Sequence, residues 1–354
     1  MTVKKLIVLV FVRWFKNMKV ARIRNKKLIR PKAYLFLAIF ILLFVLPFYL
    51  SRYYIHLLTM IFIFAVAAEA WNIIGGYGGQ FSLGHATFFG IGAYTSTMLF
   101  YYLNVSPWIG LFLGGIVAVL LSIGISHLCF HLRGPYFVIF TIGLTEVFRY
   151  LFLNQRWITL GARGMNIRYI GNAPLYFQFP GKLPYYYIAL LTTLIVVFVT
   201  HKMINSQLGY YIVALGQNQG AAEAIGVNSF KVKLKALCVS AFFTSFAGTL
   251  YAQYIYFIDP DTVFGISLSI QIMLFAVVGG AGTLWGPVIG TFILQIATEW
   301  ASATFGAGLR GLHFIIFGAI LIIIVLSGEK GMIGIFTRSY QRIEMLLAKN
   351  WEKE

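Results

Sequence analysis

Charged residues are scarce in this chain, where Asp, Glu, Lys and Arg fill only 11% of the 354 positions. Hydrophobic residues fill 60% of them and the mean hydropathy is +0.82, so the chain lacks the polar surface of a water-soluble globule. Apolar runs of roughly 20 residues, the length that crosses a bilayer, recur along the sequence. These runs lack the period-two alternation of barrel strands, which excludes a β-barrel. The composition therefore predicts an all-α polytopic membrane protein.

Two further absences exclude whole classes of chemistry. The chain has only two cysteines, Cys129 and Cys238, which lie far apart near predicted helix ends and suggest neither a disulfide framework nor a metal site. The ATP-binding pattern GxxxxGK[ST] does not occur in the sequence, so this chain does not hydrolyse ATP by itself. We therefore expect no metal, no cofactor and no enzymatic activity in this subunit.

The apolar segments predict a transmembrane domain over residues 33–328 with about ten helices. They lie at 33–50, 53–74, 86–103, 107–130, 135–153, 184–201, 236–257, 267–281, 287–305 and 311–327. The segment 267–281 is short and runs into VVGGAGTLWGP, residues 277–287, which indicates a broken or re-entrant helix and a count of about nine.

The distribution of positive charge predicts the orientation of the chain. The basic segment 1–32 contains eleven Lys or Arg and no acidic residue, which places the N-terminus in the cytoplasm by the positive-inside rule. Such a segment also suits nucleic-acid phosphate, but beside a first membrane span a topology signal that attracts anionic lipid is the simpler interpretation. Tracing the spans places the loop 154–184 outside, and the loop 202–235 and the charged tail 329–354 inside.

The sequence GGYGGQFSLGHATFFGIGAY, residues 75–94, interrupts two apolar runs. Each backbone group that such a break releases is costly in lipid, so the break belongs where protein lines a pathway. A second glycine-rich break follows residue 278. The predicted pathway residues are Glu69, Asn72, Gly75, Gly76, Gly79, Gln80, Ser82, His85, Gly279 and Gly280.

Ionisable residues inside predicted spans are functional candidates, because an acidic side chain costs roughly 2.5–3.5 kcal/mol at a helix centre. Glu69 precedes the first break by about one turn and is a candidate for lining the pathway. Arg149 follows Glu146 at i+3 on one helical face. This intramembrane ion pair either neutralises itself and fastens its helix to a neighbour, or contacts the pathway.

The cytoplasmic loop contains a segment of small residues that is predicted to be helical from 219 to 225. Gly226 ends it as a C-cap. Such a helix suits docking by a soluble protein, although a simple connector explains the pattern equally well. The residues concerned are Gln219, Ala221, Ala222, Glu223, Ala224 and Gly226.

Four separated blocks together resemble the permease subunits of branched-chain amino acid ABC importers. They are WNIIGGYGGQFSLGHATFFGIGAY at 71–94, LRGPYFVIFTIGLTEVFR at 132–149, LGYYIVALGQNQGAAEAIGVNSFKVKLKA at 208–236 and VVGGAGTLWGPVIG at 277–290. The block LRGPYF is similar to the subtype that pairs with a shorter partner permease in a heterodimer. With the closing pattern at 308–334, the resemblance covers residues from about 60 to 334.

The resemblance implies a type II-like permease of the inner membrane that imports branched-chain amino acids by alternating access. It implies a second permease, two cytoplasmic subunits that bind ATP and Mg, and an external solute-binding protein. The segment from Gln219 to Gly226 would then be the helix that couples the permease to an ATPase. Sister subfamilies that carry urea, amides or other small polar solutes leave the substrate open.

Two hypotheses of other classes stand beside the importer. A membrane-embedded lipid-modifying enzyme would use Asp259 and Asp261 to hold a divalent metal. No His, Lys or acid cluster lies near these carboxylates in the sequence. A passive channel or scaffold would need no helix for docking an ATPase. Copurification with an ATP-binding subunit would discriminate between these readings.

Overall fold

The computed structural model describes residues 42–130, 132, 134–305 and 318. The chain divides into two units, residues 1–53 and 54–354. In the first unit, the described part contains the 3-10 turn η2 (Leu46–Phe48). Half of the predicted span 33–50, nearly all of the predicted span 311–327, and both predicted terminal segments lie outside the described residues.

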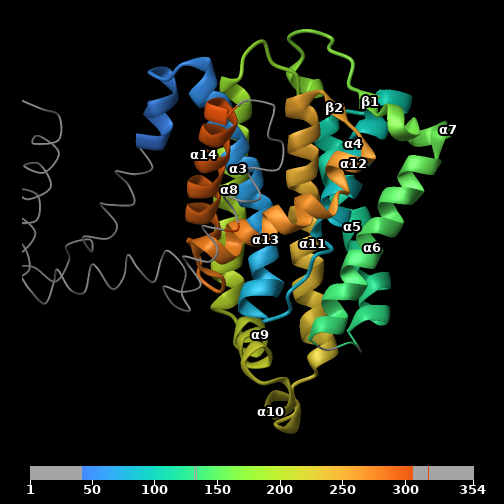
Figure 1. Cartoon of the computed structure of the whole chain (residues 1–354), viewed down its shortest axis with the longest axis vertical. Coiled ribbons are helices and arrows are strands. Elements are labelled where there is room, and N and C mark those ends of the chain that lie inside the picture. The colour runs from blue at the N-terminus through green and yellow to red at the C-terminus, as the bar shows by residue number, and fades with distance from the viewer. Residues whose placement is uncertain (1–41, 131, 133, 306–317, 319–354) are drawn as a thin grey trace, which may run out of the picture. The chain divides into compact units, whose positions relative to one another are not determined.

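The second unit is built from helices (Figure 1). Its long helices are α3 (Arg52–Asn72), α4 (His85–Leu103), α5 (Pro107–Cys129), α6 (Pro135–Asn154), α8 (Leu183–Ile204), α11 (Ser229–Ile255), α13 (Ile266–Gly280) and α14 (Gly286–Phe305). Within the described residues, six helical segments are long and apolar enough to cross a membrane. The structure therefore agrees with a multi-pass helical protein, and the count of about ten spans stays a prediction.

Short elements connect the long helices. They are η3 (Ile73–Tyr77), α7 (Arg156–Thr159), η4 (Gly161–Arg163), η5 (Pro174–Tyr176), α9 (Gln207–Gln217), α10 (Gln219–Ala224) and α12 (Pro260–Val263). The helix predicted over 219–225 is present as α10, and the segment 202–235 also contains α9 and the first turns of α11. The Asn228 side chain accepts a hydrogen bond from the Lys231 backbone N–H at 3.0 Å. This cap starts α11 well before the predicted residue 236.

Helices α4, α5 and α11 pack tightly through small residues at the centre of the unit. A Cβ atom on Gly92 of α4 would lie 2.0 Å from the Ser245 carbonyl oxygen of α11. A Cβ on Gly248 of α11 would lie 1.9 Å from the Phe89 carbonyl oxygen. Small residues let transmembrane backbones approach closely, which strengthens van der Waals packing where lipid offers no hydrophobic driving force. Around this contact α4 is buried, with Tyr94 fully enclosed.

A two-stranded ribbon departs from the all-helical prediction. Strand β1 (Met165–Asn166) pairs antiparallel with β2 (Phe257–Ile258), with Met165 opposite Ile258. Each strand has two residues, too few for any alternation to be recognised in the sequence. Figure 1 places the ribbon, α7 and α12 at one end of the unit, and α9 and α10 at the other. This arrangement agrees with the prediction that the two long loops lie on opposite sides.

Candidate translocation pathway and coupling segment

The first glycine break begins with a π-helical turn, η3, that continues α3. Wider turns of this kind occur frequently at functional sites. Beyond it, the Gln80 backbone N–H donates to the Ile74 carbonyl oxygen at 3.1 Å. The Trp71 indole N–H donates to the Ser82 carbonyl oxygen at 2.7 Å. The break is thus folded back onto α3, and protein groups satisfy backbone atoms that lipid would leave unpaired.

The N-terminus of α4 is held by side chains from neighbouring helices. His85 Nε2 lies 2.8 Å from Ser240 Oγ of α11, and that hydroxyl donates to the Ala70 carbonyl oxygen of α3 at 2.6 Å. Ser269 of α13 accepts from the Ala86 backbone N–H at 2.9 Å. Thr141 of α6 accepts from the Leu83 backbone N–H at 3.1 Å. Four helices therefore fix the point at which α4 begins.

The two glycine breaks, predicted separately from the sequence, lie against each other. Asn72 Oδ1 accepts from the Gly282 backbone N–H at 2.8 Å, and its Nδ2 donates to the Thr283 carbonyl oxygen at 2.9 Å. A Cβ atom on Gly76 would lie 2.4 Å from the Gly282 nitrogen. In the second break, a Cβ on Gly279 would lie 1.7 Å from the Gly286 carbonyl oxygen. Both breaks therefore require glycine for close backbone approach.

The predicted pathway residues divide into an enclosed set and a more accessible set. The enclosed residues are Glu69, Asn72, Gly75, Ser82, His85, Gly279 and Gly280. Gly76 and Gln80 are half-buried, and Gly79 is exposed with a φ of +64°. The carboxyl group of Glu69 is fully buried, with the side chains of Thr200 and Asn72 as polar neighbours. In the single chain, residues 76–81 are therefore partly or fully exposed, whereas the enclosed residues lie deeper in the protein.

Arg149 and Glu146 are in direct contact, as their spacing suggested. Arg149 Nε and Nη2 donate to Glu146 Oε2 at 2.9 and 2.7 Å, while Nη1 donates to Asp261 Oδ1 at 2.6 Å. The guanidinium therefore joins α6 to α12. The partner Asp261 lies 112 positions away, and no local pattern in the sequence points to it.

Asp259, the other carboxylate of the hypothetical metal site, caps a helix. Its Oδ1 accepts from the Thr262 backbone N–H at 2.7 Å, and its Oδ2 accepts from the Thr262 hydroxyl at 2.8 Å. Within the part of the chain that the structure describes, no group of three His, Cys, Asp or Glu side chains is placed to hold a metal ion. Both aspartates therefore have structural partners that account for them.

The predicted docking segment forms α10 and ends as its glycine suggested. Gly226 has a φ of +91°, and the Val227 backbone N–H donates to the Ala222 carbonyl oxygen at 3.1 Å. This geometry closes the helix C-terminus. The exposed residues of the segment include Ala221, Ala224 and Gly226, and Gln219 and Glu223 are half-buried. Ile225, which the sequence reasoning did not single out, is 80% exposed.

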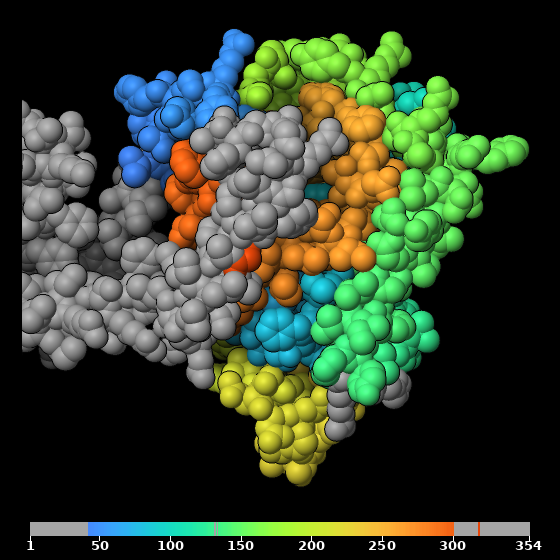
Figure 2. Space-filling view, in the orientation of Figure 1, coloured from blue at the N-terminus to red at the C-terminus, as the bar shows by residue number. Residues whose placement is uncertain are grey.

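Ala222 faces the other way and anchors α10 to the permease. It is 4% exposed, in an apolar cluster with Ile73 of η3, Ile212 and Leu215 of α9, and Val232 and Ala236 of α11. At the end of α9, a Cβ on Gly216 would lie 2.6 Å from the Tyr77 carbonyl oxygen. The helices α9 and α10 form one tip of the unit (yellow in Figure 2) and pack directly on the first glycine break.

A profile of the protein family described as "Branched-chain amino acid transport system / permease component" matches residues 53–325. The chain belongs to this family. It is 28% identical over 293 residues to the high-affinity branched-chain amino acid transport system permease protein LivM of Salmonella typhimurium, covering 77% of this chain and 68% of that protein. LivM of Escherichia coli is 28% identical over 294 residues, with the same coverage.

A shorter similarity connects this permease to a sugar transporter. The ribose import permease protein RbsC of Haemophilus influenzae is 32% identical over 91 residues, which cover 25% of this chain and 28% of that protein. No solved structure matches the chain.

The family membership confirms the resemblance inferred from the glycine-rich blocks. The chain is a multi-pass membrane permease that works within a transport system, and its relatives are transport subunits and not enzymes. The subtype suggested by LRGPYF and the pairing with a shorter permease remain predictions.

Proposed function

We propose that this permease is the transmembrane subunit of an ABC importer for branched-chain amino acids in an inner membrane, with both termini in the cytoplasm. The observation that carries the proposal is the family match, which extends over residues 53–325 and includes every helix from α4 to α14. Two relatives named as branched-chain amino acid permeases match over 77% of the chain, which supports the same substrate class.

In this proposal α10 is the helix on which a cytoplasmic ATPase docks. Its outward side presents Ala221, Ala224 and the exposed side chain of Ile225. Small side chains around one prominent apolar residue suit insertion of the helix into a groove of a partner. The partner ATPases bind ATP and Mg, and a second permease and an external solute-binding protein complete the complex.

The way in which α9 and α10 attach to the membrane core supports a mechanism of alternating access. They contact the first glycine break through Gly216, and Asn72 links that break to the turn between α13 and α14. Movement of α10 driven by ATP binding and hydrolysis would therefore reach both breaks. Broken helices of this kind rearrange around a central path when a transporter changes the side to which it opens.

In this proposal, the external binding protein supplies most of the selectivity for the substrate. In the described part of the chain, the charged side chains near the segment 76–81 include Glu69 of α3 and Lys233 of α11, and both are buried. The permease then offers a weakly discriminating, largely apolar route that suits aliphatic side chains.

Reconstitution of the complete complex in proteoliposomes tests the proposal. We expect ATP-dependent uptake of labelled leucine, isoleucine and valine, and no uptake without the ATPase subunits. Urea and ribose are included because sister subfamilies and the partial similarity to a ribose permease make them the relevant competitors. Uptake of urea or ribose, with none of leucine, would overturn the amino acid assignment and leave the importer standing. ATP-independent uptake would contradict the importer.

A further inference from the structure

Lys233 is a buried lysine close to the cytoplasmic start of α11. It is 5% exposed, whereas Lys231 and Lys235 on the same helix are exposed to solvent. Burying an ammonium group is costly unless hydrogen-bond acceptors compensate for the lost water. Lys231 and Lys235 fit the general bias of cytoplasmic loops toward positive charge. The burial of Lys233 needs a separate explanation.

One side of the Lys233 ammonium is bound to the coupling helix. Its Nζ donates to Gln219 Oε1 at 2.8 Å, and Gln219 is the first residue of α10. The Gln219 amide in turn donates through Nε2 to Glu223 Oε1 at 2.8 Å. A movement of α10 therefore changes the surroundings of a buried cation on α11.

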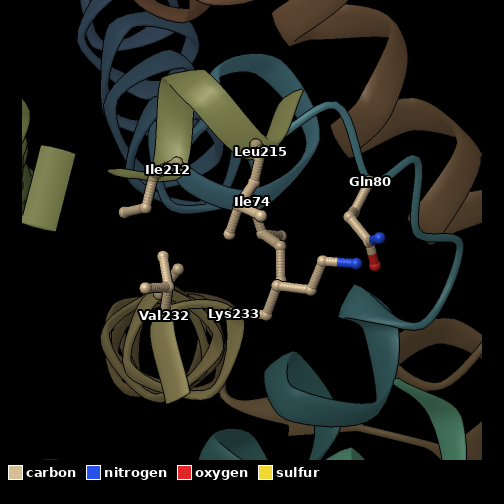
Figure 3. Close-up of a pocket in the computed structure, with 8 residues that line it drawn as sticks. Ile74, Gln80, Ile212, Leu215, Val232 and Lys233 are labelled. Carbon is tan, nitrogen blue, oxygen red and sulfur yellow. The ribbon is translucent and has the colours of Figure 1, made fainter. Parts of the chain in front are cut away.

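The other side of Lys233 faces the first glycine break. The side chain lines a cavity of about 10 Å³, room for about one water molecule, together with Ile74, Gly78 and Gln80. Figure 3 shows the ammonium pointing toward the Gln80 side chain. Gln80 Oε1 is buried and has no hydrogen-bond partner among the described residues. An unsatisfied amide acceptor and a buried donor therefore share one small space.

We propose that Lys233 is a positioning residue that transmits movement of α10 to the glycine break, by shifting its ammonium between Gln219 and Gln80. An ammonium has three donors, so it can keep one acceptor while it gains or releases the other. Charge-assisted hydrogen bonds are strong in a low-dielectric interior, which favours two discrete arrangements over a continuum. This inference rests on the proposed importer function.

The first test compares Lys233→Met with Lys231→Met and Lys235→Met in the reconstituted complex. All three variants remove one positive charge from the same helix. We expect Lys233→Met to hydrolyse ATP at close to the wild-type rate but to import on the order of tenfold less solute per ATP, from the loss of a charged hydrogen bond. The two control variants keep the wild-type ratio. Wild-type coupling in Lys233→Met, or equal losses in the controls, would overturn the proposal.

Gln80→Leu provides a test that leaves the buried charge in place. It should reproduce the loss of coupling, and the double variant with Lys233→Met should be no worse than either single variant, because both changes break one link. Normal coupling in Gln80→Leu, or losses that multiply in the double variant, would contradict a shared link.

A third measurement does not depend on which solute is carried. Phe81 at the break is 48% exposed, and Phe81→Cys can be labelled with a thiol reagent after Cys129 and Cys238 are replaced by Ala. We expect the labelling rate to change when ATP and vanadate trap the complex, and this response to disappear with Lys233→Met. If the labelling rate still responds to trapping in Lys233→Met, Lys233 does not transmit movement of α10 to the glycine break. A complex that forms but imports no amino acid would count only against the proposed substrate.

Discussion

The Gly282 backbone N–H lies 2.8 Å from Asn72 Oδ1, and this hydrogen bond joins two glycine-rich segments that are 210 positions apart in the sequence. The same Asn72 side chain donates to the Thr283 carbonyl oxygen, so one amide satisfies two backbone groups of the turn between α13 and α14. The Asn72 side chain is fully buried and its two partners are half-buried, so the side chain has no access to water as an alternative partner.

Asn72→Leu should therefore destabilise the permease. Two half-buried backbone groups lose their partners, and we expect a loss of about 1–3 kcal/mol, measured as a shift in the denaturation midpoint of the purified complex in detergent. Asn72→Asp keeps the acceptor and loses the donor, so its effect should be intermediate. Asn154→Leu, at an exposed position, serves as the control. Wild-type stability of Asn72→Leu would show that this bond contributes nothing.

Gly92 on α4 provides a test of the central helix packing. A Cβ atom at position 92 would lie only 2.0 Å from the Ser245 carbonyl oxygen, so the larger side chain of Gly92→Leu must push α4 and α11 apart. We expect little folded protein, measured by size-exclusion chromatography after membrane extraction. Gly124→Leu on α5 is the matched control, because a Cβ there meets nothing within 4 Å. Equal yields of the two variants would contradict close packing at Gly92.

Ile225 and Ala222 separate the docking role of α10 from its structural role. Ile225→Asp changes an exposed side chain, so we expect normal permease abundance but about tenfold weaker copurification of the ATPase. Ala222→Asp puts a charge into the apolar cluster below α10 and should lower both abundance and ATPase binding. If Ile225→Asp copurifies the ATPase at the wild-type level, the outward side of α10 is not the docking surface.

Cysteine labelling in whole cells tests the proposed orientation. Single cysteines at positions 162 and 172 should react with a membrane-impermeant reagent from outside, and those at 218 and 228 should not. All four positions are exposed in the structure, so differences in reactivity report the side of the membrane. Native Cys129 and Cys238 are first replaced by Ala. The inverse pattern would place α10 outside the cell and exclude an ATPase as its partner.

Local patterns in the sequence determined the elements of this protein. Apolar runs predicted helices near the observed α4, α5 and α6, because helix length in a bilayer is set by its thickness. Gly226 marked the end of α10, since it occupies a left-handed conformation that favours glycine. Spacing alone suggested the contact between Glu146 and Arg149, because residues at i and i+3 share one face of a helix.

Only the tertiary structure decided which of these elements meet. The contacts of Asn72 with Gly282, of Arg149 with Asp261 and of Lys233 with Gln219 connect different structural elements. A hydrogen bond between distant segments depends on how whole helices pack, and no periodic pattern encodes that placement. The exposure of Ile225 and the burial of Ala222 could not be predicted from the sequence for the same reason, since both are apolar residues of one short segment. Which side of α10 is buried depends on the packing of α9 and α11 beneath it.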